Sequence, residues 1–173
     1  MSLVSISGFI ALIAYILSII PKNAATVFPV TKKTKFIKLL FKYRKHTGLS
    51  AFFLSSIHAR ITIYQMNIDL LSLNTYYYYS GIIAFTIFIL LAVTSNKFSI
   101  KKLKKNWKLL HSLTYIAMVM LLIHVWSMME SNWTKLTGVG LCLLGSITIM
   151  YLIRLCIDSE LKLWQSDRNS SSI

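Results

Sequence analysis

The chain has 173 residues, of which 55% are hydrophobic, and its mean hydropathy is +0.62. Apolar runs this long and frequent exclude a water-soluble globular domain and indicate membrane spans. The formal net charge of +14 would suggest a nucleic-acid partner in a soluble protein, but here the basic residues lie in short segments that flank the apolar runs. We therefore expect contacts with membrane lipid and no nucleic-acid partner.

Taken in chain order, the predicted elements are membrane helices. Each apolar segment is close to the ~20 residues that cross the hydrocarbon core of a bilayer, and a helix satisfies its own backbone hydrogen bonds there. About five such segments occur, at residues 4–20, 47–66, 76–94, 107–128 and 133–157, and a basic interfacial stretch over 36–45 leads into the second. The predicted fold class is an all-α, polytopic membrane helix bundle over residues 1–165, followed by a flexible tail over 166–173.

The lysines and arginines predict the orientation of this bundle. Residues 21–46 hold eight of them, residues 95–108 hold six, and the tail from Arg154 holds three, whereas the two opposite loops hold only Arg60 and Lys135. Five spans would place the three basic regions on one side of the membrane. By the positive-inside rule the N-terminus is expected outside and the C-terminus in the cytoplasm, as a multi-pass protein of a bacterial inner membrane.

All four histidines lie in or at the ends of two apolar segments: His46 and His58 in the second, His111 and His124 in the fourth. Ionisable side chains are costly inside a bilayer, so they indicate function, and imidazole is a common axial ligand of haem iron. At a rise of ~1.5 Å per residue, His58 lies about 17 Å and His124 about 25 Å from the cytoplasmic boundary. These depths predict an outer pair, His58 with His124, and an inner site built from His111 and His46.

Helical rotation adds a further candidate to the inner site. Arg44 precedes His58 by fourteen residues, which brings both within about 40° of one helix face. Arg44 therefore points to where an inner haem would lie. His111 and His124 are about 140° apart on an ideal helix, so they face one neighbour only if the helix bends or tilts.

Other interpretations stay open. His46 could face lipid headgroups, and His111 could bind a loop carbonyl near the inner surface. The protein could be a structural or assembly subunit whose histidines are merely packed, or a histidine-lined metal permease. The predicted spans contain no acidic residue, which counts against a proton-coupled permease. Cys142 and Cys156 lie in one predicted helix and need no special role.

Two stretches resemble a known family. The first is RKHTGLSAFF at 44–53, closing on His58; the second joins LAVTS at 91–95 to WKLLHSLTY at 107–115 and ends at His124. In order and spacing they are similar to the ferric-reductase-like transmembrane family, and within it to the haem-binding membrane subunits of the MsrQ type. The W-x-x-L-H block after a basic turn is the more specific part.

The resemblance implies that His58, His111 and His124 are ligands of haem b, and so of its iron. Arg44 falls where larger ferric reductases and NADPH oxidases carry a further ligating histidine. The expected number of haems is therefore one, with two as the alternative. His46, two positions further on, departs from the family pattern.

The resemblance also implies electron transport across or out of the membrane through bis-histidine haem. Larger family members continue into flavin and nicotinamide domains, but this chain has no glycine-rich nucleotide loop. We expect an oxidoreductase subunit that takes electrons from a quinol, a flavin or a flavoprotein. Its expected acceptor is a redox partner, such as an extracytoplasmic reductase, or a metal ion.

Overall fold

The structure is a computed structural model that describes residues 3–66, 76–131 and 134–170. These residues are helical apart from short turns, and they contain no strand, which confirms the predicted all-α class. The elements are α1 (Leu3–Val27), the 3-10 helix η1 (Pro29–Lys33), α2 (Lys35–Met66), α3 (Tyr76–Val93), α4 (Lys97–Leu103), α5 (Lys105–Ser131) and α6 (Lys135–Ser170).

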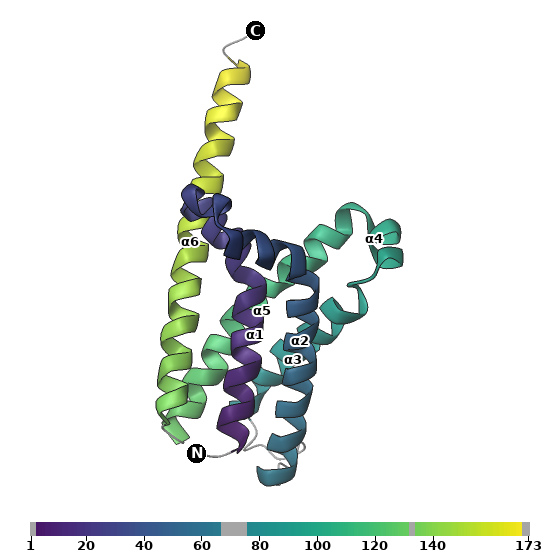
Figure 1. The fold of residues 1–173 in the computed structure, drawn as a ribbon, viewed down its shortest axis with the longest axis vertical. Helices are drawn as coiled ribbons and strands as arrows, with labels where there is room; N and C mark the ends of the chain where they lie inside the picture. Colours follow the sequence, from purple (N-terminus) through teal and green to yellow (C-terminus); the bar gives the residue numbers. More distant parts are fainter. Residues whose placement is uncertain (1–2, 67–75, 132–133, 171–173) are drawn as a thin grey trace.

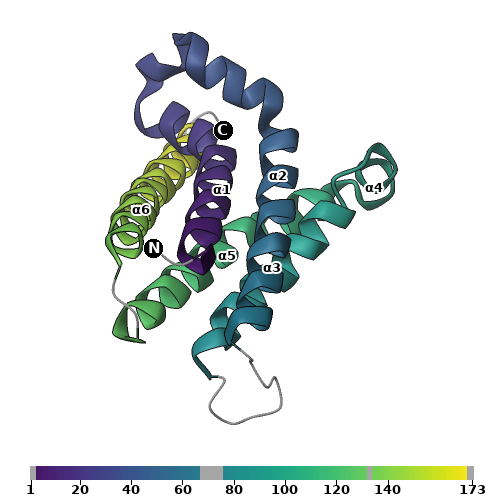
Figure 2. The same cartoon turned by 60° about the horizontal axis from the view of Figure 1, so that its bottom comes forward.

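The basic segments gather at one end of the molecule. Figure 1 shows the start of α1 at one end, with η1, the first part of α2, α4 and the last part of α6 at the other. Figures 1 and 2 show α2 turning, so that its basic first part lies across this end before its second part runs beside α1. The exposed lysines of these segments are Lys32, Lys33, Lys35, Lys38, Lys42, Lys45, Lys97, Lys101, Lys102, Lys104, Lys105 and Lys108. This clustering is the one expected if that end faces the cytoplasm.

The helices pack mainly as two pairs. α1 lies against α2, and α3 lies against α5, while α6 contacts both α1 and α5. Within the described residues, no Cα of α2 comes within 8 Å of a Cα of α5. The two histidine-bearing helices therefore face one another across a gap that their backbones do not fill.

A small apolar core holds the pairs together. Its buried members are Leu12, Tyr15, Ile16, Ile19, Ala51, Ile87, Phe88, Ala117, Met118, Leu144 and Ile147. Ala51 and Ala117 let neighbouring helices approach closely, as small residues do in membrane bundles. On the outside, large apolar side chains such as Leu109, Phe53 and Ile149 are exposed. An outer surface of this kind is suited to lipid rather than to water.

Within the part of the chain that the structure describes, three helices are long and apolar enough to cross a membrane: Leu3–Val27, Lys105–Met128 and Lys135–Leu161. A fourth span results if Tyr79–Val93 and Lys97–Leu103, which are bent by 95°, count as one. The chain is thus an integral membrane protein. α2 does not meet this criterion because its apolar part is interrupted by polar and basic side chains. The predicted fifth crossing, by α2, stays a prediction.

Two boundaries differ in detail from the sequence-based expectation. At the turn between α3 and α4, Asn96 caps α4 by accepting a hydrogen bond from the Ser99 N–H (2.7 Å), and Lys104, with φ 47°, ends that helix. At the other end of the chain, α6 continues to Ser170, well beyond the expected end of the last span. Residues 67–75, between the second and third predicted spans, and 132–133, where the last predicted span begins, lie outside the described residues.

Candidate functional site

Two cavities lie between the helix pairs. The outer cavity, of about 550 Å³, is near the N-terminus, and the inner cavity, of about 610 Å³, is near the basic end. The outer cavity is lined in part by Gly8, His58, Thr62, His124, Val125 and Met128. The inner cavity is lined in part by Lys22, Arg44, Lys45, Trp107, Lys108 and His111. Both volumes lie within the range of about 300–1,000 Å³ that is usual for sites of cofactors and small molecules.

An aromatic pair separates the two cavities. Tyr15 of α1 and Phe88 of α3 line both cavities, and their ring centroids are 5.2 Å apart. Tyr15 is 2% exposed, and its hydroxyl donates a hydrogen bond of 2.6 Å to the carbonyl oxygen of Thr114 on α5. This bond links α1 to α5 across the gap and fixes the position of the pair.

The outer cavity brings together the histidines of the predicted outer pair. His58 comes from α2 and His124 from α5, and both are half-buried. Each imidazole lies against a glycine of the helix paired with its own. A Cβ atom added to Gly8 of α1 would lie 2.9 Å from Cε1 of His58, and one added to Gly81 of α3 would lie 2.8 Å from both Nδ1 and Cε1 of His124. The two glycines thus leave room for the two rings.

This arrangement fits a haem. Two imidazoles, from His58 and His124, can supply nitrogen ligands from helices whose backbones are held apart. The rest of the lining is largely apolar and includes Leu12, Leu121 and Val125. A porphyrin supplies four ligands to its own iron, so the protein needs to add only two. The described residues contain no cluster of three or more His, Cys, Asp or Glu side chains that could hold a bare metal ion.

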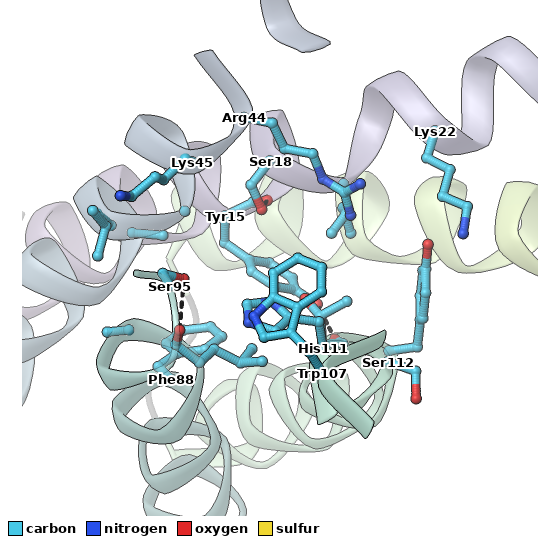
Figure 3. A pocket seen from close by; sticks show the side chains of 18 of the residues that line it. Tyr15, Ser18, Lys22, Arg44, Lys45, Phe88, Ser95, Trp107, His111 and Ser112 are labelled. Carbon is cyan, nitrogen blue, oxygen red and sulfur yellow. Dashed lines mark hydrogen bonds between the residues drawn. The ribbon is translucent and has the colours of Figure 1, made fainter. Parts of the chain in front are cut away.

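The inner cavity has a different donor set. Figure 3 shows Arg44 and Lys22 reaching into it opposite Trp107 and His111. The rings of Trp107 and His111 are in contact, with centroids 4.1 Å apart and planes tilted by 31°. This cavity therefore offers one imidazole and one guanidinium, rather than two imidazoles.

Thr94 at the end of α3 explains the spacing of the W-x-x-L-H block. The Trp107 indole Nε1 donates to the Thr94 carbonyl oxygen at 3.0 Å, and His111 Nε2 lies 3.4 Å from the Thr94 hydroxyl oxygen. The Thr94 hydroxyl also donates to the carbonyl oxygen of Leu90 at 2.7 Å. Residues four apart lie on one helix face, which lets both rings reach the same threonine.

The lining of the inner cavity is strongly basic. Lys22, Arg44, Lys45 and Lys108 all contribute, and its described lining residues include neither Asp nor Glu. Such a lining suits a carboxylate or phosphate group, because charged hydrogen bonds to oxyanions are strong.

His46 lies elsewhere. It is exposed, its ring centroid is 6.1 Å from that of Tyr43, and it is not among the lining residues of either cavity. Arg44, rather than His46, shares the inner cavity with His111.

A buried arginine next to the inner cavity was not predicted. Arg154, counted in the sequence as part of a basic cytoplasmic tail, is only 7% exposed. Its Nη1 donates to the hydroxyl oxygen of Tyr115 at 2.6 Å and to Oδ1 of Asn23 at 3.1 Å, and its Nε donates to Asp158 at 3.3 Å. Tyr115 lines the inner cavity and stacks on Tyr151 at 4.0 Å. Arg154 therefore ties α6 to α1 and α5.

The fold and the site thus define a membrane helix bundle with two histidines in one cavity between separated helices. Residues 7–123 match the family described as ferric reductase like transmembrane component. This is more than half of the chain, so the protein belongs to that family. The resemblance seen in the sequence is thus confirmed, although the matched region ends one residue before His124.

Similar curated proteins include MsrQ subunits and a magnetosome protein. The chain is 31% identical over 103 residues to the protein-methionine-sulfoxide reductase heme-binding subunit MsrQ of Xanthomonas campestris, and 28% identical over 123 residues to MsrQ of Brucella ovis. These alignments cover 54% and 66% of this chain. The magnetosome protein MamZ of Magnetospirillum gryphiswaldense is 37% identical over 95 residues, which are 51% of this chain.

The chain spans about half the length of these MsrQ proteins, 46% and 54%, and 15% of MamZ. No solved structure matches the chain.

Proposed function

We propose that this protein is a b-type cytochrome subunit of the membrane, which carries electrons through a haem held between His58 and His124. The observation that supports this proposal is that the two imidazoles, from α2 and α5, line one cavity between helices whose backbones stay apart. The names of the MsrQ relatives, which describe heme-binding subunits, agree with it.

A haem held by His58 and His124 would supply a one-electron iron couple, and ligation by two imidazoles would suit electron transfer rather than oxygen binding. The chain itself positions these imidazoles and keeps water away. Gly8 and Gly81 give the rings their space, and the apolar side chains of α1 and α5 line the remaining wall. A dry and apolar shell also influences the redox potential of a site.

One haem is the proposed number, because only the outer cavity offers two histidines. The inner cavity, with His111 and Arg44, is the candidate for a second haem. Its basic lining would also suit the propionates of such a haem or the phosphate of a flavin donor. Two measurements distinguish a second haem from a flavin in the inner cavity: the amount of haem per chain and the fluorescence of extracted flavin.

The proposed partners follow from the relatives. The MsrQ proteins are subunits of a protein-methionine-sulfoxide reductase system by name, and we propose a comparable redox partner for this chain on the outer side of the membrane. The electron donor is proposed to be a quinol, a flavin or a flavoprotein. The exposed lysines of α4 and of the first part of α2 would contact anionic lipid headgroups.

The proposed orientation has the N-terminus outside and the basic end in the cytoplasm of a bacterial inner membrane. The clustering of lysines at one end supports it. Fusions of a cytoplasmic fluorescent reporter and of a periplasmic phosphatase to the C-terminus test it. Fluorescence without phosphatase activity is expected, and the reverse pattern would contradict the orientation.

The haem proposal is tested by visible spectra of the protein purified in detergent. A reduced-minus-oxidised spectrum of low-spin b type is expected, with about one haem per chain. His58→Ala and His124→Ala should each abolish this spectrum. His46→Ala is the matched control, since that exposed histidine lines neither cavity, and it should retain full haem content.

His111→Ala decides the inner site. Loss of half of a two-haem content would support a second haem there, whereas unchanged content would support one. A protein that stays colourless despite haem supplementation would overturn the proposal. A structural subunit or a histidine-lined permease would then remain.

A further inference from the structure

Ser7 of α1 lies within hydrogen-bond distance of His58, the outer histidine of α2. Its hydroxyl oxygen lies 3.2 Å from Nδ1 of His58 and 3.0 Å from the carbonyl oxygen of Val4, one turn earlier. All three groups are at least half-buried. A serine hydroxyl has one proton to donate, so these two contacts constrain one another.

The pairing of the Ser7 hydroxyl sets the direction of both hydrogen bonds. The hydroxyl donates its one proton to the carbonyl oxygen of Val4. The Ser7 oxygen then accepts from His58, which requires a proton on Nδ1. With Nδ1 protonated, a neutral imidazole has its free lone pair on Nε2.

The neighbouring residue restricts the ring as well. Gly8 leaves a space in which an added Cβ would lie 2.9 Å from Cε1, 3.2 Å from Nδ1 and 3.3 Å from Nε2 of His58. The imidazole is therefore in close contact with the α1 backbone, and both Gly8 and His58 line the outer cavity.

We propose that Ser7 is the positioning residue for the haem ligand His58: its hydroxyl selects the Nδ1–H form of the ring and leaves Nε2 to bind iron. This inference rests on the proposed function, because it assumes that His58 is a ligand. Hydrogen bonds to the second nitrogen of a ligating histidine are a general device that fixes the tautomer and raises the basicity of the ligand.

Ser7→Ala is the test, made in the full-length protein in detergent and measured by haem titration and redox potentiometry. Loss of such an outer hydrogen bond usually weakens binding about 10–100-fold, and we expect haem affinity to fall by a factor in this range. A less basic ligand stabilises ferric iron less, so the midpoint potential should rise. A merely structural serine would lower stability without this shift in potential.

Two further variants complete the design. Ser7→Thr keeps a hydroxyl and should restore the potential. Ser159→Ala is the matched control, because the Ser159 hydroxyl on α6 also donates to the carbonyl three residues earlier, at 2.7 Å, but is exposed. It should leave both haem affinity and potential unchanged.

The outcomes separate this inference from the proposed function. If His58→Ala abolishes haem binding while Ser7→Ala behaves like Ser159→Ala, His58 remains a ligand and the role of Ser7 is refuted. If His58→Ala keeps its haem, the ligand assignment itself is wrong, and the role of Ser7 falls with it. A raised potential in Ser7→Ala that Ser7→Thr reverses supports the inference.

Discussion

Replacing Gly81 by alanine should disturb His124 more than it helps the helix that carries the glycine. The added Cβ would lie 2.8 Å from Nδ1 and Cε1 of the imidazole, whereas carbon atoms prefer separations of about 3.5–4.0 Å. The ring would have to move by about 0.7–1.2 Å, the difference between these distances. Overpacking of this kind typically costs about 1–3 kcal/mol.

Two effects of opposite sign therefore compete in Gly81→Ala. Alanine is better than glycine in a helix by about 1 kcal/mol, which offsets part of the clash. Gly145 on α6 provides the matched control, because a Cβ there meets nothing within 4 Å. Gly145→Ala should show the helix gain alone. The free energies of unfolding of the two variants should differ by about 1–3 kcal/mol, the cost of overpacking, with Gly81→Ala less stable.

The assay is thermal or denaturant unfolding of both variants without haem in detergent, followed by haem titration. Gly81→Ala should also bind haem more weakly and show an altered Soret band, because His124 is displaced. The reasoning would be refuted if Gly81→Ala were as stable as Gly145→Ala and took up haem with an unchanged spectrum. In that case the imidazole would not lie against Gly81.

Three other changes give independent checks. Trp107→Phe keeps an aromatic ring beside His111 but removes the hydrogen bond to Thr94, and should lower the free energy of unfolding by about 0.5–1.5 kcal/mol; an unchanged value would show that this bond does not stabilise the fold. Arg154→Leu leaves Asn23, which is fully buried, without its charged donor and should cost about 1–3 kcal/mol in the same measurement. Asp158→Asn removes only the ion pair with Arg154, in which the Asp158 side chain is 39% exposed, and should change the free energy of unfolding by less than about 1 kcal/mol. A larger loss than in Arg154→Leu would contradict this ranking.

The helical class and the pairing of histidines across the bundle could be predicted because both depend on local regularities. Apolar segments of spanning length fix which residues form helices, and the rise per residue placed His58 and His124 at comparable depths. The rotation between Arg44 and His58 likewise predicted that these two side chains share a face. In the structure they line the inner and the outer cavity along the same helix.

The remaining details depend on how helices cross, which spacing along one helix does not reveal. An ideal helix separates His111 and His124 by about 140°, yet both meet α3, at Thr94 and Gly81 respectively. Figure 1 shows α5 running obliquely across the bundle, so different faces of α5 reach the same neighbour at different depths.

The residues of α1 that contact His58 could not be predicted from the sequence either. Ser7 and Gly8 lie in an apolar helix whose sequence pattern does not mark them as neighbours of a histidine. Their contact with His58 follows only from the packing of α1 on α2. Arg154 was counted among the basic residues of the C-terminal tail because Lys162 and Arg168 follow it. Only the structure shows its buried partners on α1 and α5.

The separation of α2 from α5 has a consequence for the life of the protein in the cell. A cavity lies between the α1–α2 pair and the α3–α5 pair. While this cavity is empty, the bundle lacks the packing contacts that a bound ligand would provide. A ligand that binds only the folded state adds stability according to its concentration relative to its Kd. Newly made chains should therefore be more open to membrane proteases until the cavity is filled, and the steady-state amount of the protein should follow the haem supply of the cell.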